Sequence, residues 1–149
     1  MPDEEEELDV EAQIECLQKA LRLQYRSAIQ FTLAAGSMVG FAYSHFGASL
    51  WQFAQSDLED ARRLVEKIKT LGADPTTDMA PLHYSNDPVE LIEKLIESEN
   101  ECAEALQASI EPTGREARSE AIEHRLEHMI MRKQEQIDLL ERARRQPGE

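Results

Sequence analysis

The sequence predicts an all-α protein built as a bundle of four helices. Its 149 residues suit one domain, and the low aromatic content of 5%, with six Gly and six Pro, is typical of long helices rather than of a β-sandwich. Apolar residues recur at three- and four-residue steps in four separate stretches. We expect the bundle to span residues 9–146, between an acidic tail at 1–8 and a short tail at 147–149.

The first two helices are each predicted from one apolar stripe. The first is expected between Asp9 and Ala35, after which Gly36, Ser37 and Gly40 interrupt the pattern. The second begins near Phe46 and ends where Gly72 supplies a C-terminal stop. The two stripes contain Ile14, Leu17, Leu21, Ala28, Phe31 and Ala35, and then Phe46, Leu50, Phe53, Leu64, Ile68 and Leu71.

Residues 73–86 have two prolines and no apolar period, so they are expected to form a long ordered connection. The third helix is predicted to open at Asp87 as the N-cap, with Pro88 in the first turn and Glu90 closing a capping box, and to end by Pro112. Residues 113–116 repeat the capping-box pattern before the fourth helix. The apolar stripes are Ile92, Leu95, Cys102 and Leu106, and then Ile122, Leu126, Met129 and Leu140.

The lengths of the connections predict the topology. Short links after the first and third helices force antiparallel hairpins, whereas the long link between the second and third can run the length of the bundle and join two parallel helices. The alternative is a simple up-down-up-down bundle, in which the long connection does not run the length of the bundle and all sequential helices are antiparallel.

Each helix also carries polar residues near mid-length, where its stripe demands burial. These residues are Gln24, Asp57, Asp60, Glu99, Lys133 and Gln136. An unpaired charge or amide in an apolar interior costs several kcal/mol, so these side chains are expected to satisfy one another or a ligand. The first and third helices each supply one of these residues, and the second and fourth helices each supply a pair spaced i, i+3. This is the layout of di-iron carboxylate bundles.

The chemistry of that layout is changed here. Relative to the plan of Glu, Glu-x-x-His, Glu and Glu-x-x-His, only Glu99 is unchanged. On the first helix Gln24 replaces a Glu. On the second helix Asp57 and Asp60 replace Glu and His, and on the fourth helix Lys133 and Gln136 replace the second Glu and His.

Short motifs on three helices carry a resemblance to a known family. They are Leu23-Gln24 with Ala28-Ile29-Gln30-Phe31, then Asp60-Ala61-Arg62-Arg63-Leu64, then Gln136-Ile137-Asp138-Leu139-Leu140-Glu141. In these motifs the chain resembles bacterioferritin, over nearly its whole length, and the resemblance implies a ferritin-like bundle.

The resemblance also implies what is lost. The position of the family's haem-ligating Met is Leu58, so no haem of that type is expected. The sequence ends soon after the fourth helix and leaves no room for the fifth helix that the family places around the four-fold axes of its cage, so the resemblance does not carry over to a 24-subunit cage, and the choice between dimer and cage stays open.

Three readings of the polar layer remain open. Asp57, Asp60 and Glu99 supply three negative charges and Lys133 one positive, and an ammonium about 4 Å from a divalent ion is repelled by roughly 8 kcal/mol at a dielectric near 20. In the preferred reading Lys133 replaces a lost iron and pairs with Glu99 and Asp57, while Gln24 and Gln136 satisfy the remaining lone pairs. The alternatives are one divalent ion, Fe, Mn, Mg or Ca, held by the three carboxylates, or a working di-iron pair.

Composition limits the kinds of binding partner and the cellular location that the sequence predicts. A formal net charge of −14 and a pI near 4.7 disfavour binding to nucleic acid and to membrane surfaces, and neither is expected as a partner. No signal peptide or membrane span is recognisable, which predicts a cytoplasmic protein. Cys16 and Cys102 lack metal-site spacing and are expected to be free thiols.

Two surface features complete the expectations. His124 and His128 are spaced i, i+4, which suits a two-imidazole metal site, but they lie off the apolar stripe and an exposed charged face is preferred. The apolar segment 38–43, with Leu23, Ile29 and Leu33 off the main stripe, predicts a homodimer through the first two helices, or else a corner folded onto its own bundle.

Together these features predict a non-catalytic ferritin-like protein with a salt-bridged core layer, acting as a dimerising or cargo-type interaction module. Any larger assembly or encapsulating partner is left open. The alternative is an iron or other divalent-metal binding or storage protein with residual ferroxidase activity.

Overall fold

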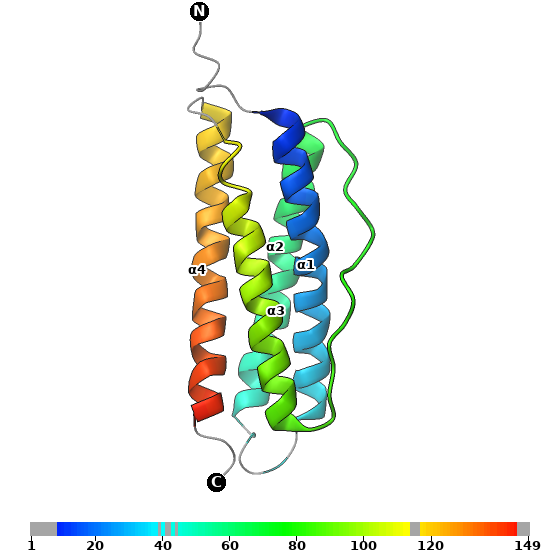
Figure 1. Ribbon diagram of the computed structural model, residues 1–149, viewed down its shortest axis with the longest axis vertical. Helices are drawn as coiled ribbons and strands as arrows, with labels where there is room; N and C mark the ends of the chain where they lie inside the picture. Colours follow the sequence, from blue (N-terminus) through cyan, green and yellow to red (C-terminus); the bar gives the residue numbers. More distant parts are fainter. Residues whose placement is uncertain (1–8, 39, 41–42, 44, 114–116, 146–149) are drawn as a thin grey trace, which may run out of the picture.

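The structure, a computed structural model, describes residues 9–38, 40, 43, 45–113 and 117–145. Four helices follow one another, α1 (Val10–Ser37), α2 (Phe46–Thr70), α3 (Pro88–Ala108) and α4 (Ala117–Arg145). They form one bundle in which α1 and α4 run in one direction and α2 and α3 in the other (Figure 1). The prediction of an all-α bundle with two antiparallel hairpins and a long crossover is confirmed, and the up-down-up-down alternative is wrong.

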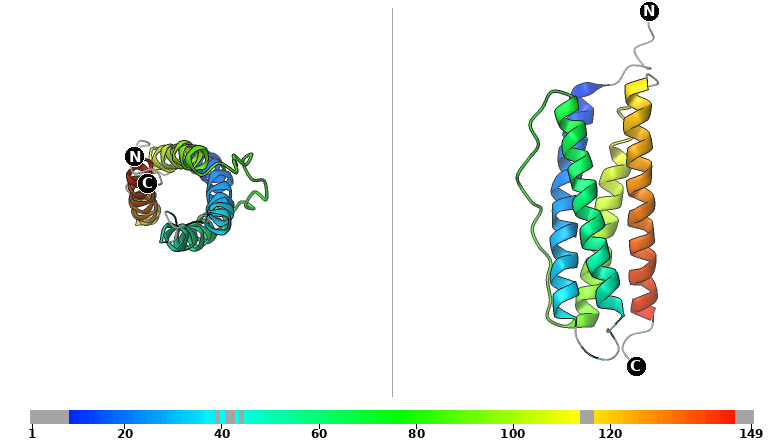
Figure 2. Two further views of the ribbon diagram at one scale, coloured as in Figure 1. Left: turned by 90° about the horizontal axis from the view of Figure 1, so that it is seen from below. Right: turned by 180° about the vertical axis from the view of Figure 1, so that it is seen from behind.

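The helices surround the core unevenly. Helix α1 packs closely against α2 and α3, and α3 packs against α4, whereas α2 and α4 touch at only a few points. Seen along the bundle axis, the ring of helices is widest between α2 and α4 (Figure 2). One side of the bundle is therefore more open than the other three.

The helix ends only partly follow the predicted caps. The Asp9 carboxylate accepts a hydrogen bond of 3.2 Å from the backbone amide of Ala12, as an N-cap does. Asp87 makes no such bond through its side chain, so the predicted capping box is wrong there, and the Ser85 hydroxyl instead accepts from the Asp87 amide at 3.1 Å. The second predicted capping box includes residues 114–116, which lie outside the described residues.

Helix α2 ends at Thr70, and the expected stop, Gly72, follows the C-cap Leu71 with a φ of 93°, in the left-handed region that favours glycine. Helix α3 ends at Ala108, four residues before the predicted stop at Pro112. The turn over 109–112 therefore belongs to the connection rather than to the helix.

The crossover between α2 and α3 lies along the outer side of α1 (Figure 1). The Gln18 side chain holds it twice, because it donates to the carbonyl of Asp74 at 2.7 Å and accepts from the amide of Thr76 at 2.7 Å. Further along, Gln30 accepts from the amide of His83 at 2.6 Å. Side chains of α1 thus satisfy backbone groups of a segment that has no periodic hydrogen bonds of its own.

The apolar core is divided into two clusters. One includes Leu17, Leu21, Leu64, Leu106 and Leu126, and the other includes Phe31, Leu50, Leu91, Leu95 and Leu140. The polar residues predicted at mid-length lie between these clusters along the helices, where water is excluded from above and below. None of the four helices, over the described residues, is both long and apolar enough to cross a membrane.

Candidate functional site

The centre of the bundle is a buried ionic layer around Lys133 on α4, whose side chain is only 1% exposed. Its Nζ lies 3.0 Å from Asp57 Oδ2 on α2 and 3.0 Å from Glu99 Oε2 on α3. The same ammonium donates to Ser27 Oγ on α1 at 2.7 Å and to Gln136 Oε1 at 3.2 Å. One cation therefore ties together all four helices.

Ser27 is a member of this layer that the sequence reasoning missed. Its hydroxyl accepts from Lys133 and makes hydrogen bonds with both Asp57 and Glu99. The signal for it was present, since Ser27 follows Gln24 by three residues and so shares its face of the helix. A single serine is common in helices, and for that reason the signal is weak.

The proton count in the layer points to a protonated Glu99. A serine hydroxyl has one hydrogen, so it can donate to only one of the two carboxylates that it contacts. The second contact then needs a carboxyl proton, with Ser27 as the acceptor. Burial raises the pKa of Glu99 to about 7, with Lys133 opposing and the Asp57 carboxylate adding to the rise. Below about pH 7, where Glu99 holds its proton, the Asp57, Lys133 and Glu99 group is electrically neutral; above that pH Glu99 is a second carboxylate beside Lys133.

The ammonium keeps its charge in this setting. Burial by itself lowers the pKa of Lys133, but the carboxylates of Asp57 and Glu99 outweigh burial and hold the pKa above its ordinary value. A permanent positive charge is therefore held at the centre of the bundle.

Two amide side chains complete the layer. Gln136 donates to Asp57 Oδ1 at 2.9 Å and so satisfies a lone pair of that carboxylate. Gln24 donates instead to the backbone carbonyl of Asp57 at 3.2 Å and accepts from the Cys102 thiol at 3.2 Å. Burial raises the pKa of that thiol to about 12, and it is a free cysteine, as is Cys16.

Asp60, one turn after Asp57, belongs to a different group. Its carboxylate accepts from Arg132 of α4 at 2.8 and 2.6 Å and from Arg63 at 3.1 Å. Its side chain is 2% exposed, whereas that of Arg132 is 30% exposed. The structure therefore places Asp60 apart from the other expected ligands, against two guanidinium groups at the wide side of the bundle.

The residues present do not fit the metal pair that the layout implies. Lys133 Nζ lies against the two central carboxylates, at 3.0 Å from each, and the third carboxylate is occupied by guanidinium groups. Within the described residues, no group of three or more His, Cys, Asp and Glu is arranged to hold a metal ion.

The remaining expected residues lie at the surface or near it. His124 and His128 are exposed, with their Nε2 atoms 3.1 Å apart. Leu58, at the position of the haem ligand, is 53% exposed. Ile29 and Leu33 are 39% and 38% exposed, whereas the residue grouped with them, Leu23, is buried. Of the apolar segment 38–43, residues 39, 41 and 42 lie outside the described residues.

Comparison with known proteins agrees with the fold of the bundle. A structure described as "ferritin like, diiron-carboxylate proteins" from Bacillus anthracis str. Ames is 26% identical, with a TM-score of 0.84, covering 91% of this chain and 97% of that one. Bacterioferritin from Rhodobacter capsulatus, described with a metal-free dinuclear site and haem iron, has a TM-score of 0.79 at 17% identity, covering 89% and 82%. At that identity the likeness shows the fold alone.

A search of curated protein sequences found no match. The family model for the ferritin-like domain matches residues 14–146, nearly the whole bundle. The chain therefore belongs to the ferritin-like domain family.

Proposed function

We propose that this protein is a non-catalytic ferritin-like bundle in which a lysine-centred salt bridge takes the place of the metal pair, and that the bundle serves as a dimerising interaction module. The observation that carries the proposal is the position of Lys133 Nζ, 3.0 Å from both Asp57 and Glu99. An ammonium there satisfies the carboxylates that a metal would otherwise need.

Electrostatics supports this assignment. The two carboxylates hold the pKa of Lys133 above its ordinary value, so the ammonium does not become a neutral amine under physiological conditions. A divalent ion placed about 4 Å from it would be repelled by roughly 8 kcal/mol at a dielectric near 20. Oxidation of iron at a metal pair would have to overcome that repulsion at each turnover.

The test is metal analysis of purified protein with oxygen uptake after addition of ferrous iron. We expect less than about one tightly held iron per chain and no rapid oxygen uptake. The matched variant Lys133→Glu with Gln136→His restores the ligand types of the di-iron plan and should raise iron affinity. Tight iron binding with rapid oxidation by the unmodified protein would contradict the proposal.

A second candidate is a protein that binds one divalent metal. It is favoured by the description of the Bacillus anthracis structure as a diiron-carboxylate protein, at 26% identity to this chain. Under this alternative Lys133→Gln should strengthen metal binding, because the competing charge is gone while Asp57 and Glu99 remain. An unmodified protein that already binds Mn²⁺ or Fe²⁺ at a stoichiometry of about one per chain would favour this candidate.

The dimer is proposed to form through the outer faces of α1 and α2. Phe31 and Phe53 meet inside the bundle with ring centroids 5.3 Å apart, which sets the register of the two antiparallel helices. Leu33 and Trp51 each lie two residues from that contact, so they are level with each other and point away from it. Both are exposed, at 38% and 47%.

Light scattering at micromolar concentration tests the dimer. Leu33→Glu with Trp51→Glu should convert the dimer to a monomer, because two charges would be buried at the interface. The matched control is Met131→Glu on α4, which is 59% exposed and lies outside the proposed interface. A monomeric unmodified protein would contradict this part of the proposal.

A further inference from the structure

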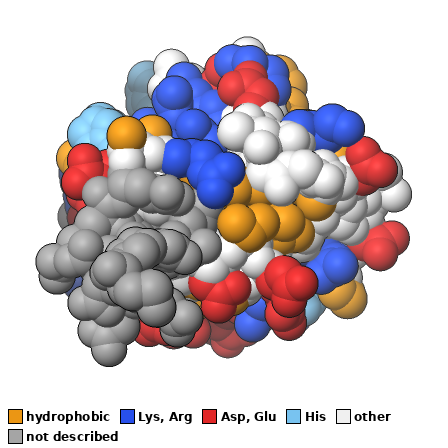
Figure 3. Space-filling view, turned by 90° about the horizontal axis from the view of Figure 1, so that it is seen from above, with side chains coloured by type: hydrophobic (Ala, Val, Ile, Leu, Met, Phe, Trp, Pro, Cys, Tyr) orange, Lys and Arg blue, Asp and Glu red, His pale blue; other side chains and the backbone are white. Residues whose placement is uncertain are grey.

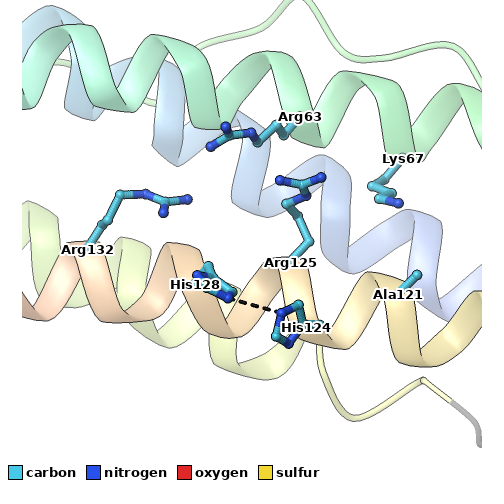
Figure 4. A pocket seen from close by; sticks show the side chains of 7 residues that line it. All are labelled: Arg63, Lys67, Ala121, His124, Arg125, His128 and Arg132. Carbon is cyan, nitrogen blue, oxygen red and sulfur yellow. Dashed lines mark hydrogen bonds between the residues drawn. The ribbon is translucent and has the colours of Figure 1, made fainter.

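A basic groove lies on the wide side of the bundle, between α2 and α4. We define this α2–α4 groove by the six side chains Arg63, Lys67, His124, Arg125, His128 and Arg132, which line a cavity of about 420 Å³. In Figure 4 the four cationic side chains from the two helices approach the space between them, and the two imidazoles meet on α4. The groove exists because α2 and α4 pack against each other at only a few points.

The charge of this groove is opposite to that of the chain as a whole. The sequence has 30 acidic and 16 basic residues, yet the described residues that line the groove include four Lys or Arg, two His and no acid. Asp60 pairs with Arg63 and Arg132, and Glu59 also pairs with Arg63, so the excess positive charge of the groove rests mainly on Lys67 and Arg125. Lys and Arg side chains also gather on one part of the surface at the end where α2 finishes and α4 begins (Figure 3).

Two of these cations are available to a ligand. Arg63 and Arg132 are held by Asp60, but among the described residues no hydrogen bond or ion pair of the Lys67 or Arg125 side chain is found. Like charges gathered around one cavity repel one another, and a bound anion would relieve this repulsion. The groove therefore presents an excess of positive charge that an anion would balance.

We propose that the α2–α4 groove binds a small phosphate-bearing anion. Guanidinium groups match phosphate oxygens in bidentate fashion, an ammonium adds a point charge, and an imidazole N–H donates a further hydrogen bond. The volume of about 420 Å³ lies in the range of small-molecule pockets and exceeds what one phosphate fills, which suits a phosphorylated metabolite. The ligand is small because the net charge of −14 repels a long polyanion.

The histidine pair does not make this groove a metal site. Its Nε2 atoms lie 3.1 Å apart, which suits two ligands of one ion. However, Arg125 on the same helix and Lys67 across the groove would both repel a divalent cation. The same two charges attract an anion.

Calorimetric titration of the full chain at low ionic strength tests the proposal. The probes are inorganic phosphate, pyrophosphate and ATP, with citrate as a carboxylate anion of similar charge. We expect the phosphate compounds to bind more tightly than citrate, with affinities that fall as salt is added. Tighter binding of ATP would identify a phosphorylated metabolite as the ligand type, and tighter binding of inorganic phosphate would identify the free ion.

Two variants locate the binding. Arg125→Gln and Lys67→Gln leave the contacts of Asp60 untouched, and each should lower the affinity for the best phosphate probe about tenfold. The control Arg142→Gln makes the same change of charge on α4, about 25 Å further along the helix, and should have little effect. Circular dichroism establishes that each variant is folded.

Three results with the anion probes would overturn the proposal. They are the absence of binding for every phosphate probe, equal binding of citrate, and binding that neither groove variant weakens. Binding of Zn²⁺ that requires both histidines and is unchanged by Arg125→Gln would also overturn it, because it would assign the groove to a metal.

Discussion

Two aspartates one turn apart on α2 show how burial decides the balance of charge. Asp57 lies in the core layer, where one lysine that is 1% exposed serves two carboxylates. Asp60 lies beside the α2–α4 groove, where its carboxylate contacts two of the four cations that line the groove, Arg63 and Arg132, and Arg132 is 30% exposed. In the core, desolvation penalises every unbalanced charge, so the layer approaches neutrality by holding a proton on Glu99. At the groove, solvent screens the excess of positive charge, so this excess is tolerated in the folded protein and can attract an anionic ligand.

The largest effect is expected from removing the central cation. Lys133→Met leaves Asp57 and Glu99 buried together without a counter-charge and should lower the free energy of unfolding by about 3–5 kcal/mol. Urea denaturation at pH 8 measures the change. Lys133→Met with Glu99→Gln should recover part of the loss, and Arg142→Met on the same helix should change stability by less than about 0.5 kcal/mol. A loss below about 1 kcal/mol for Lys133→Met would mean that the layer is more hydrated than its burial indicates.

A pH dependence should follow from Glu99. Folding raises its pKa from 4.5 to about 7, so the folded state holds this proton more tightly than the unfolded state. The resulting stabilisation is complete below about pH 4.5 and is lost as the pH rises through about 7, with a total of about 3 kcal/mol. The difference in stability between the unmodified protein and Glu99→Gln, measured in urea from pH 4 to 8, isolates this contribution. A difference that does not vary with pH would contradict a raised pKa.

A smaller effect is expected at the second aspartate. Arg132→Gln removes two charge-assisted hydrogen bonds from Asp60 but leaves Arg63, so the loss should be about 1–2 kcal/mol. In thermal unfolding this corresponds to a fall in Tm of about 3–6 °C for a chain of this size. Arg62→Gln, which breaks only exposed ion pairs with Glu59 and Glu66 on the same helix, should leave Tm unchanged. Equal losses for the two variants would remove the distinction between buried and exposed partners.

The smallest expected effect is a stabilisation rather than a loss of stability, and it comes from removing the charge of Arg125. In the absence of ligand, Arg125→Gln relieves repulsion in the α2–α4 groove and should stabilise the protein by less than about 0.5 kcal/mol. The gain should disappear in about 1 M salt, where charges are screened within about 3 Å. Chemical denaturation with urea at two salt concentrations measures it. Destabilisation at low salt would show that Arg125 has a structural partner.

The sequence predicted the fold well because loop lengths and apolar stripes limit how four helices can connect. It also identified five residues of the core layer, because Gln24, Asp57, Glu99, Lys133 and Gln136 interrupt stripes that must be buried, but it missed Ser27, whose residue type is common in helices. It did not separate Asp57 from Asp60, since both lie on the inward half of α2 and only the position of Arg132 on α4 decides which one faces the groove. The groove itself was missed apart from its histidines, because it depends on how far α2 and α4 stand apart, a distance that no local pattern encodes.

The thiol of Cys102, which donates a hydrogen bond to Gln24 inside the layer, can be used to detect local opening of the bundle. Thiolates react with alkylating reagents, and a thiol whose pKa is raised to about 12 supplies almost no thiolate while the helices stay closed. Cys16 is only partly buried and should react in the native protein. The ratio of the alkylation rates of Cys102 and Cys16 therefore reports how often the centre of the bundle opens locally, and no probe has to be introduced.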